Sequence, residues 1–261
     1  MNVKTIVKVM NFHALIRVDR ARREANQYKL LEAEVSRMID IIQNNRNLIL
    51  DRWVLIPDKK APRLRIYIGS DLGFCGAVNA SVNAALENED PENTVVVIGK
   101  KIREKKFIDL NLSREEFEER YDEIEKILTD GIRCRKYSGI DIFYDHFYNM
   151  SHMEPVMKTI FPIKLEGDNK QAYNDDFIIE GGNVNDLMEE LIITYLNYEV
   201  KTAAVNAFAS ENIIRQNATD DSLKRIEETE AEQRWEERKV KNSETCRRVI
   251  DSYTKTKYRN R

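Results

Sequence analysis

The stretch LRIYIGSDLGFCGA, residues 64–77, decides the fold because it joins a strand directly to a helix. The apolar run from Leu64 to Gly69 favours a buried strand. Three glycines within eight residues then interrupt any regular element, and residues 77–86 resume with helical spacing. A strand that passes through a tight glycine turn into a helix is the building unit of an α/β domain.

The sequence on both sides of this junction continues the same alternation. Further short apolar runs predict strands at Thr94–Gly99, Ile140–Asp145 and Phe177–Glu180. A helix is predicted from Ser113 to Thr129, because Ser113-x-x-Glu116 forms a capping box. We therefore expect an open, mostly parallel α/β sheet.

All nine glycines and all five prolines lie between Pro57 and Gly182. Glycine destabilises a helix interior by about 1 kcal/mol and proline by about 3 kcal/mol, so both ends of the chain favour long helices. We predict three parts: an N-terminal coiled-coil helix (1–56), a central α/β domain (57–182) and a C-terminal coiled-coil helix (183–261). The predicted class is α/β plus coiled coil.

Each predicted end helix carries an apolar seam at steps of three and four residues, which is coiled-coil spacing. The seam of the first helix is Val3, Val7, Met10, Ala14, Ala21, Ala25, Tyr28, Leu31, Val35, Met38 and Ile42. That of the last is Leu187, Leu191, Tyr195, Tyr198, Thr202, Val205 and Ala209. The central domain returns the chain near its departure point, so we expect an antiparallel pair. The alternative is two independent helices packed on the domain.

Composition limits the class of protein. The 261 residues are 42% apolar and 33% charged, and no run approaches the roughly 20 apolar residues of a membrane helix. We see no signal peptide, and three widely spaced cysteines suit reduced thiols, so we expect a cytosolic protein that does not span a membrane. The net charge of −3 and the lack of a basic face argue against nucleic-acid binding. The basic end from Arg247 to Arg261 fits a solvated terminus better than a phosphate-binding segment.

The glycine turn allows three interpretations. A phosphate-binding loop is disfavoured, because the spacing fits no known fingerprint and Asp71 repels phosphate. Cys75 at a helix start is a candidate nucleophile, with His146 or His152 as its base. The third interpretation is a structural turn in which small residues, Cys75 and Gly76, let the helix pack closely on the sheet.

The run Ser70-Asp71-Leu72-Gly73-Phe74-Cys75-Gly76-Ala77-Val78-Asn79 resembles the Ser-Asp-Arg-Gly-Leu-Cys-Gly-Gly-Leu-Asn signature of the gamma subunit of F-type ATP synthases. The resemblance extends in order along the chain. It includes Lys8-Val9-Met10 with Ala14 and Arg17, Phe147-Tyr148-Asn149-Met150-Ser151 with Pro155 and Phe161-Pro162, and Ala209-Ser210-Glu211 with Arg215.

This resemblance implies a non-catalytic rotor shaft without a cofactor. It would transmit torque between a membrane proton rotor, the c-ring, and a hexameric ring of alpha and beta subunits, with an epsilon-like subunit beside the central domain. The implied location is the cytoplasmic side of the cell membrane, where the complex would be held peripherally. The signature or partner-contact candidates are Lys8, Met10, Arg17, Ser70, Asp71, Gly73, Cys75, Gly76, Asn79, Ser210, Glu211 and Arg215.

The sequence also departs from the family pattern. Leu72 replaces the arginine of the signature, the family's first turns before Lys8 are largely absent, and residues 216–221 replace a Met- and Ala-rich run. Three alternatives therefore stay open: a gamma-like shaft of an F1-like ATPase with another mechanical task, a non-rotating coiled-coil adaptor, and a cysteine- or nucleotide-dependent enzyme.

Overall fold

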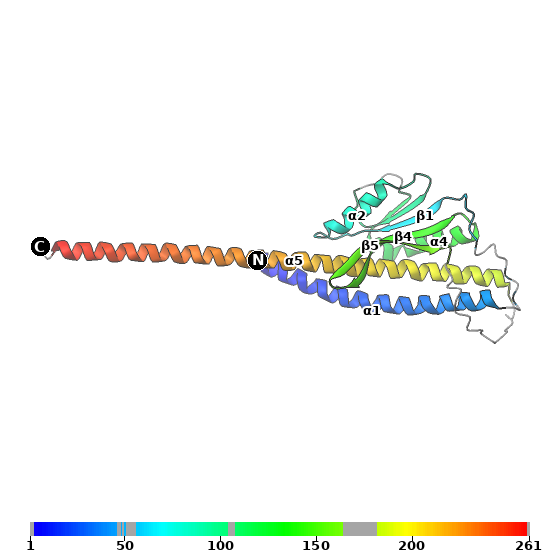
Figure 1. Cartoon of the computed structure of the whole chain (residues 1–261), viewed down its shortest axis with the longest axis horizontal. Coiled ribbons are helices and arrows are strands. Elements are labelled where there is room, and N and C mark those ends of the chain that lie inside the picture. The colour runs from blue at the N-terminus through cyan, green and yellow to red at the C-terminus, as the bar shows by residue number, and fades with distance from the viewer. Residues whose placement is uncertain are drawn as a thin grey trace. The chain divides into compact units, whose positions relative to one another are not determined.

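The computed structural model describes residues 3–45, 48, 50, 56–103, 108–163 and 182–259, with side chains described as far as residue 252. Contacts divide the chain into a larger unit, Ala14–Arg215, and a smaller unit, Met1–His13 with Gln216–Arg261. Helix α1 spans Val3–Asn44 and helix α5 spans Val184–Arg259, so each contributes residues to both units (Figure 1).

The larger unit contains a five-stranded sheet in the order β3-β2-β1-β4-β5. Its strands are β1 (Arg63–Ile68), β2 (Thr94–Ile98), β3 (Leu110–Leu112), β4 (Gly139–Asn149) and β5 (His152–Phe161). The first four are parallel, with Ile66 beside Val96 and Ile142, whereas β5 runs antiparallel to β4. The predicted open and mostly parallel sheet is confirmed.

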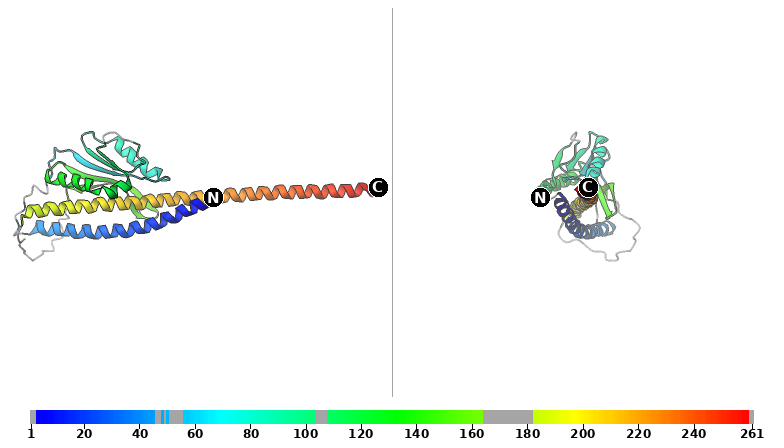
Figure 2. Two further views of the ribbon diagram at one scale, coloured as in Figure 1. Left: turned by 180° about the vertical axis from the view of Figure 1, so that it is seen from behind. Right: turned by 90° about the vertical axis from the view of Figure 1, so that its left-hand side faces the viewer.

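Helices cover both faces of this sheet (Figure 2). Helix α2 (Gly76–Glu87) packs Val82 and Leu86 against Tyr67 and Val97. On the other face, α3 (Arg114–Glu119), α4 (Tyr121–Arg133) and the first part of α5 cover the even-numbered residues of β1. The core on this face includes Leu64, Ile66, Phe117, Ile124, Leu128, Met188, Ile192 and Leu196.

Helices α1 and α5 run antiparallel within each unit. In the larger unit Ala21 packs with Val205 and Ala209, and further along, the ring of Tyr28 lies 6.4 Å from that of Tyr198. In the smaller unit the Lys4 ammonium lies 3.3 Å from Glu227 and 3.1 Å from Glu230, and Asn11 bonds to Asp220. The prediction of an antiparallel pair, rather than two independent helices, is therefore confirmed in both units.

The predicted seam of α1 was wrong at several positions. Leu31 and Met38 are 46% and 51% exposed, whereas Val18 and Ile39 are buried. In this part of α1 the side chains that face inward are those of Tyr28, Glu32, Val35, Ile39 and Ile42, so the series includes a glutamate. Counting only apolar residues therefore selected the neighbouring face of the helix.

Three elements differ from the sequence-based expectation. The capping box is present, with Ser113 Oγ accepting from the Glu116 N–H at 3.2 Å, but the predicted helix breaks at Arg120 into α3 and α4. Strands β3 and β5 were not predicted. Strand β3 is only three residues long, and β5 contains Pro155 and alternating polar residues, which are unusual in a predicted strand. The predicted strand Phe177–Glu180 lies outside the described residues.

Candidate functional site

The signature loop that follows β1 is docked on α5. The Leu72 backbone N–H donates to Glu211 Oε1 at 3.0 Å, and the Cys75 thiol donates to the Glu211 backbone carbonyl at 3.4 Å. Ser70, Cys75 and Glu211 are all buried. The loop is thus attached to one residue of the helix through both its side chain and its backbone.

The loop is also fixed internally by Asn79, which lies in the first turn of α2. Its Oδ1 accepts from the Ser70 N–H at 3.0 Å, and its Nδ2 donates to Ser70 Oγ at 3.2 Å. The Ser70 hydroxyl donates in turn to the Leu72 carbonyl at 3.1 Å. These bonds hold the Leu72 N–H in position for Glu211.

The Asp71 carboxylate joins three loops. One oxygen accepts from the Lys100 N–H at 2.6 Å, and the other accepts from the Arg114 N–H at 3.0 Å. Lys100 follows β2 and Arg114 begins α3, directly after β3. Asp71, which follows β1, therefore links the segments at the carboxyl ends of β1, β2 and β3 by hydrogen bonds. The sequence named Asp71 as a signature or partner-contact candidate and as a residue that repels phosphate, but it did not predict these bonds within the chain.

A second bond connects α5 to the sheet next to Glu211. Ser210 Oγ donates to the Asp145 backbone carbonyl of β4 at 3.0 Å, and Ser210 is fully buried. Nearby, the Arg114 guanidinium lies 3.2 Å from the centre of the Phe208 ring, and burial lowers the Arg114 pKa. The sequence offered one missed signal here, because Asp141 and Asp145 are charged residues in an otherwise apolar strand.

Burial controls the electrostatics of this site. Burial raises the pKa of Glu211, although the Leu72 N–H and the Arg114 charge act in the opposite direction. Burial, followed by the charge of Glu211, raises the pKa of the Cys75 thiol to about 12. Both groups therefore favour their uncharged forms more than they do in water.

This environment argues against Cys75 as a nucleophile. The thiol is 1% exposed and remains protonated at neutral pH. The two candidate bases have other partners: His146 Nδ1 lies 3.0 Å from the Tyr144 hydroxyl, and His152 Nε2 lies 3.9 Å from Glu154.

The close-packing role expected for Gly76 was wrong. A Cβ at Gly73 or Gly76 would meet nothing within 4 Å, and the left-handed conformation belongs to Phe74, at φ 69°. By contrast, a Cβ at Gly69, Gly99, Gly131 or Gly139 would meet another atom at 2.7–3.0 Å. A Cβ at Gly69 would lie 2.8 Å from Ile102, and Gly99 has φ +139°.

The position of Glu211 argues against a phosphate site at the loop. In doubly wound sheets, ligands bind beyond the carboxyl ends of the strands where the strand order reverses. That point lies between β1 and β4 here, and α5 occupies it with Ser210 and Glu211. A carboxylate of the chain itself takes the N–H that a bound anion would otherwise accept from.

The remaining candidate residues are distributed differently. Arg215 is half-buried, and its Nε has no hydrogen-bond partner among the described residues. Arg17 is exposed on α1 and lines a cleft of about 650 Å³ together with Asp71 and Glu211. Lys8 is exposed and Met10 half-buried, and both belong to the smaller unit.

Sequence reasoning missed an apolar stripe on α1 in the smaller unit. Val3, Ile6, Val9 and Phe12 recur every three residues and are 64%, 40%, 47% and 62% exposed. Each step of three brings neighbours together on the helix surface but turns by about 60°, so the series winds half-way round α1 instead of lining one face. The three-residue spacing was readable, but the stripe was overlooked in favour of the seam that faces α5.

Comparisons with known proteins agree with this architecture. A family model described as ATP synthase matches residues 1–243. The ATP synthase gamma chain of Clostridium novyi is 29% identical over 232 residues, covering 84% of this chain and 80% of that protein. That of Clostridium perfringens is 26% identical over 248 residues, covering 87% and 83%.

Solved structures show the same fold at lower identity. A chain in the central stalk and c-ring of the Tetrahymena thermophila mitochondrial ATP synthase has a TM-score of 0.58 at 17% identity, covering 83% of this chain and 99% of its own. A chain of the Euglena gracilis enzyme has a TM-score of 0.51 at 13% identity, covering 92% and 91%. In the described part of the chain, no helix is long and apolar enough to cross a membrane. The chain therefore belongs to the ATP synthase gamma-chain family.

Proposed function

We propose that this chain is a rotor shaft that transmits torque between a membrane proton rotor and a catalytic ring of alpha and beta subunits. The attachment of the signature loop to Glu211 carries this proposal. A shaft transmits torque to an attached domain only when the two are rigidly joined. The bonds that Leu72 and Cys75 donate to Glu211, and the bond that Ser210 donates to the Asp145 carbonyl, join the α/β domain to α5. The antiparallel packing of α1 on α5 adds stiffness.

The chain contributes mechanics, while the ring contributes the chemistry of ATP. An asymmetric shaft turning inside a ring biases each nucleotide site in sequence, so that the rotor angle couples the sites. The chain needs no catalytic group for this role, which fits a neutral Cys75 and a loop whose carboxylates are already engaged.

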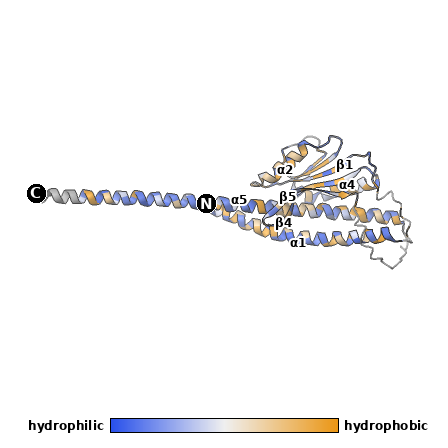
Figure 3. Cartoon of the chain, in the orientation of Figure 1, coloured by the Kyte–Doolittle hydropathy of each residue, from blue (hydrophilic) through white to orange (hydrophobic). Residues whose placement is uncertain are grey.

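Different surfaces would serve different partners. The apolar stripe Val3, Ile6, Val9 and Phe12 is suited to the alpha and beta subunits. The α/β domain would contact the c-ring and an epsilon-like subunit, which would hold the chain peripherally at the cytoplasmic face of the membrane. Beyond Glu227, α5 is mostly hydrophilic (Figure 3), as expected for a surface that must not adhere while turning.

Two features of the sequence motivate a second candidate. From Glu227 to Glu237 the helix carries six glutamates, and Leu72 stands where the family signature has arginine. The second candidate is an F1-like ATPase that uses the same shaft for a mechanical task other than proton transport, and it ranks below the synthase because the relatives are ATP synthase gamma chains. A non-rotating adaptor is less favoured, because no observation here requires it.

Rotation can be tested with a thiol already present in the chain. Cys134 is exposed at the end of α4, whereas Cys75 is buried. In a complex carrying Cys246→Ser and immobilised through its beta subunits, a gold nanorod attached to Cys134 should rotate in steps of one-third of a turn during ATP hydrolysis. The isolated complex should also contain one copy of this chain per three alpha–beta pairs.

Control measurements distinguish the rotor, the non-rotating adaptor and the F1-like ATPase that does not pump protons. A complex with Cys134→Ser should bind no probe. Steady hydrolysis without rotation of the attached rod would refute the rotor proposal and favour the adaptor. Rotation in a complex that pumps no protons when reconstituted with its membrane sector would favour the second candidate.

A further inference from the structure

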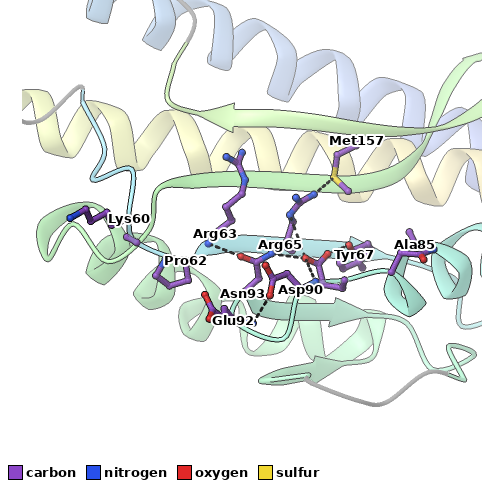
Figure 4. A pocket seen from close by; sticks show the side chains of 13 residues that line it. Lys60, Pro62, Arg63, Arg65, Tyr67, Ala85, Asp90, Glu92, Asn93 and Met157 are labelled. Carbon is purple, nitrogen blue, oxygen red and sulfur yellow. Dashed lines mark hydrogen bonds and ion pairs between the residues drawn. The ribbon is translucent and has the colours of Figure 1, made fainter.

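A second pocket lies in the larger unit, away from the signature loop. Its volume is about 540 Å³, and it opens beside β1, the C-terminal end of α2 and the turn before β2 (Figure 4). Its lining includes Lys60, Arg65, Glu89, Asp90, Glu92 and Met157. Pockets of this size are large enough for a small organic ligand.

Arg65 has too few hydrogen-bond acceptors. Its side chain is 24% exposed, and its Nε is buried without a hydrogen-bond partner among the described residues. Among the described residues, its Nη1 donates only to the Met157 thioether sulfur at 3.5 Å, which is a weak acceptor (Figure 4). The Nε donor of Arg65 is therefore left without a hydrogen bond, although the Asp141 and Glu89 carboxylates lie within ion-pair distance of it.

The neighbouring acids do not satisfy Arg65 because other donors already engage them. Asp141 accepts two bonds from Arg63, at 2.7 and 2.8 Å, and one from Thr159 at 2.6 Å. Glu89 accepts from Tyr67 and from Asn93. Their oxygens lie 3.3 and 3.8 Å from Arg65 Nε, without hydrogen-bond geometry.

We propose that this pocket binds a carboxylate group, held by the Arg65 guanidinium with the Lys60 ammonium at the rim. A carboxylate matches the planar guanidinium in two parallel hydrogen bonds. The Lys60 ammonium has no acidic partner among the described residues. Asp90 and Glu92 also line the pocket and disfavour a multiply charged phosphate. The carboxylate is supplied by a small organic acid or by an acidic side chain of a partner protein.

Arginine Nε–Hε resonances of the ¹⁵N-labelled full chain test this proposal. The Arg65 signal is identified by its loss in Arg65→Lys, whose folding is verified by thermal unfolding. Added acetate, at constant ionic strength, should shift this signal saturably, whereas chloride should not and inorganic phosphate should bind more weakly. Lys60→Gln should weaken acetate binding about threefold, as expected for one partly exposed charge.

Lys59→Gln is the matched control, because Lys59 is adjacent but does not line the pocket. It should leave the acetate affinity unchanged. A shift that does not saturate, that chloride reproduces, or that is equally weakened by Lys59→Gln would overturn the proposal. In the assembled complex, protection of Arg65 from phenylglyoxal without added acid indicates a partner carboxylate, whereas protection that requires acetate indicates a free acid.

Discussion

Lys158 on β5 places its ammonium 2.7 Å from both carboxylate oxygens of Glu199 on α5. The Glu199 side chain is 3% exposed and also accepts from the Tyr195 hydroxyl at 2.9 Å. Burial and the Glu199 charge raise the pKa of Glu32 on α1. One buried carboxylate thus connects the edge strand to α5 and lies near α1.

Replacing Lys158 with methionine should destabilise the chain by about 2 kcal/mol, because the Glu199 carboxylate would stay buried without its charged partner. Urea unfolding at pH 7 measures the change. Lys158→Arg keeps the charge and should cost less. If the double variant Lys158→Met with Glu199→Met is as unstable as Lys158→Met, the pairing does not explain the loss.

Glu211→Ala should cost about 1–3 kcal/mol, because the Leu72 N–H would be left unpaired in a buried site. Glu211→Gln keeps an oxygen acceptor and should cost less. Glu237→Ala, on the exposed part of α5, is the control and should change the free energy of unfolding by less than about 0.5 kcal/mol.

The pH dependence of Glu211 gives a separate test. Its folded pKa is raised above the ordinary value of 4.5, so the stability it contributes is fully present below that value. That contribution decreases as the pH rises through the folded pKa. The difference in unfolding free energy between Glu211→Gln and the original chain should therefore grow in favour of glutamine from pH 4 upward. A constant difference would show that Glu211 titrates normally.

Cys75 should resist alkylation in the folded chain. Iodoacetamide at pH 8.5 should modify Cys134 and Cys246 within minutes and Cys75 only after denaturation, because the folded thiol has a pKa of about 12. The raised pKa also predicts loss of stability as the pH rises from 9 toward 12, and Cys75→Ala should reduce that slope. Mass spectrometry identifies the modified sites; equal labelling of all three thiols would contradict the prediction.

Gly99→Ala should destabilise the chain by about 1–3 kcal/mol, because its φ of +139° is unfavourable for alanine and its Cβ would lie 3.0 Å from the Gly69 backbone. Gly73→Ala should be nearly neutral, since its Cβ meets open space. Thermal unfolding of the two variants compares them directly. The signature glycine would thus tolerate substitution better than a glycine outside the motif.

Val205→Pro tests the shaft itself. Proline should disrupt α5 by about 3 kcal/mol where Val205 packs on Ala21, and thereby abolish ATP-driven proton pumping while part of the ATP hydrolysis remains. Val205→Ala is the control and should preserve pumping. Reconstituted vesicles report both rates, and unimpaired pumping in the proline variant would count against torque transmission through this segment.

The fold was readable from local signals. Glycine and proline were confined to the centre, and the strands around Ile66, Val96 and Ile142 are nearly continuous in apolar residues because both faces of the sheet are covered. The signature around Cys75 was equally readable. These features depend on propensity and burial, which short windows of sequence encode.

The connections within the site were not readable. Glu211 lies 139 residues from Leu72, and Lys158 lies 41 residues from Glu199, so nothing local marks either pair. Strand β5 is an edge strand that tolerates Pro155 and polar residues, and Glu32 replaces an apolar residue on the inner face of α1. These pairs, the edge strand and the inward position of Glu32 all depend on contacts between elements that are distant in the sequence.

The presence of Glu211 at the carboxyl end of β1 has a consequence for regulation. Glu211 belongs to the same polypeptide as the loop, so its effective concentration at the Leu72 N–H is fixed. A diffusible anion at this position would instead dissociate when its concentration fell. The attachment of the signature loop to α5 at this position is therefore independent of the concentration of any metabolite.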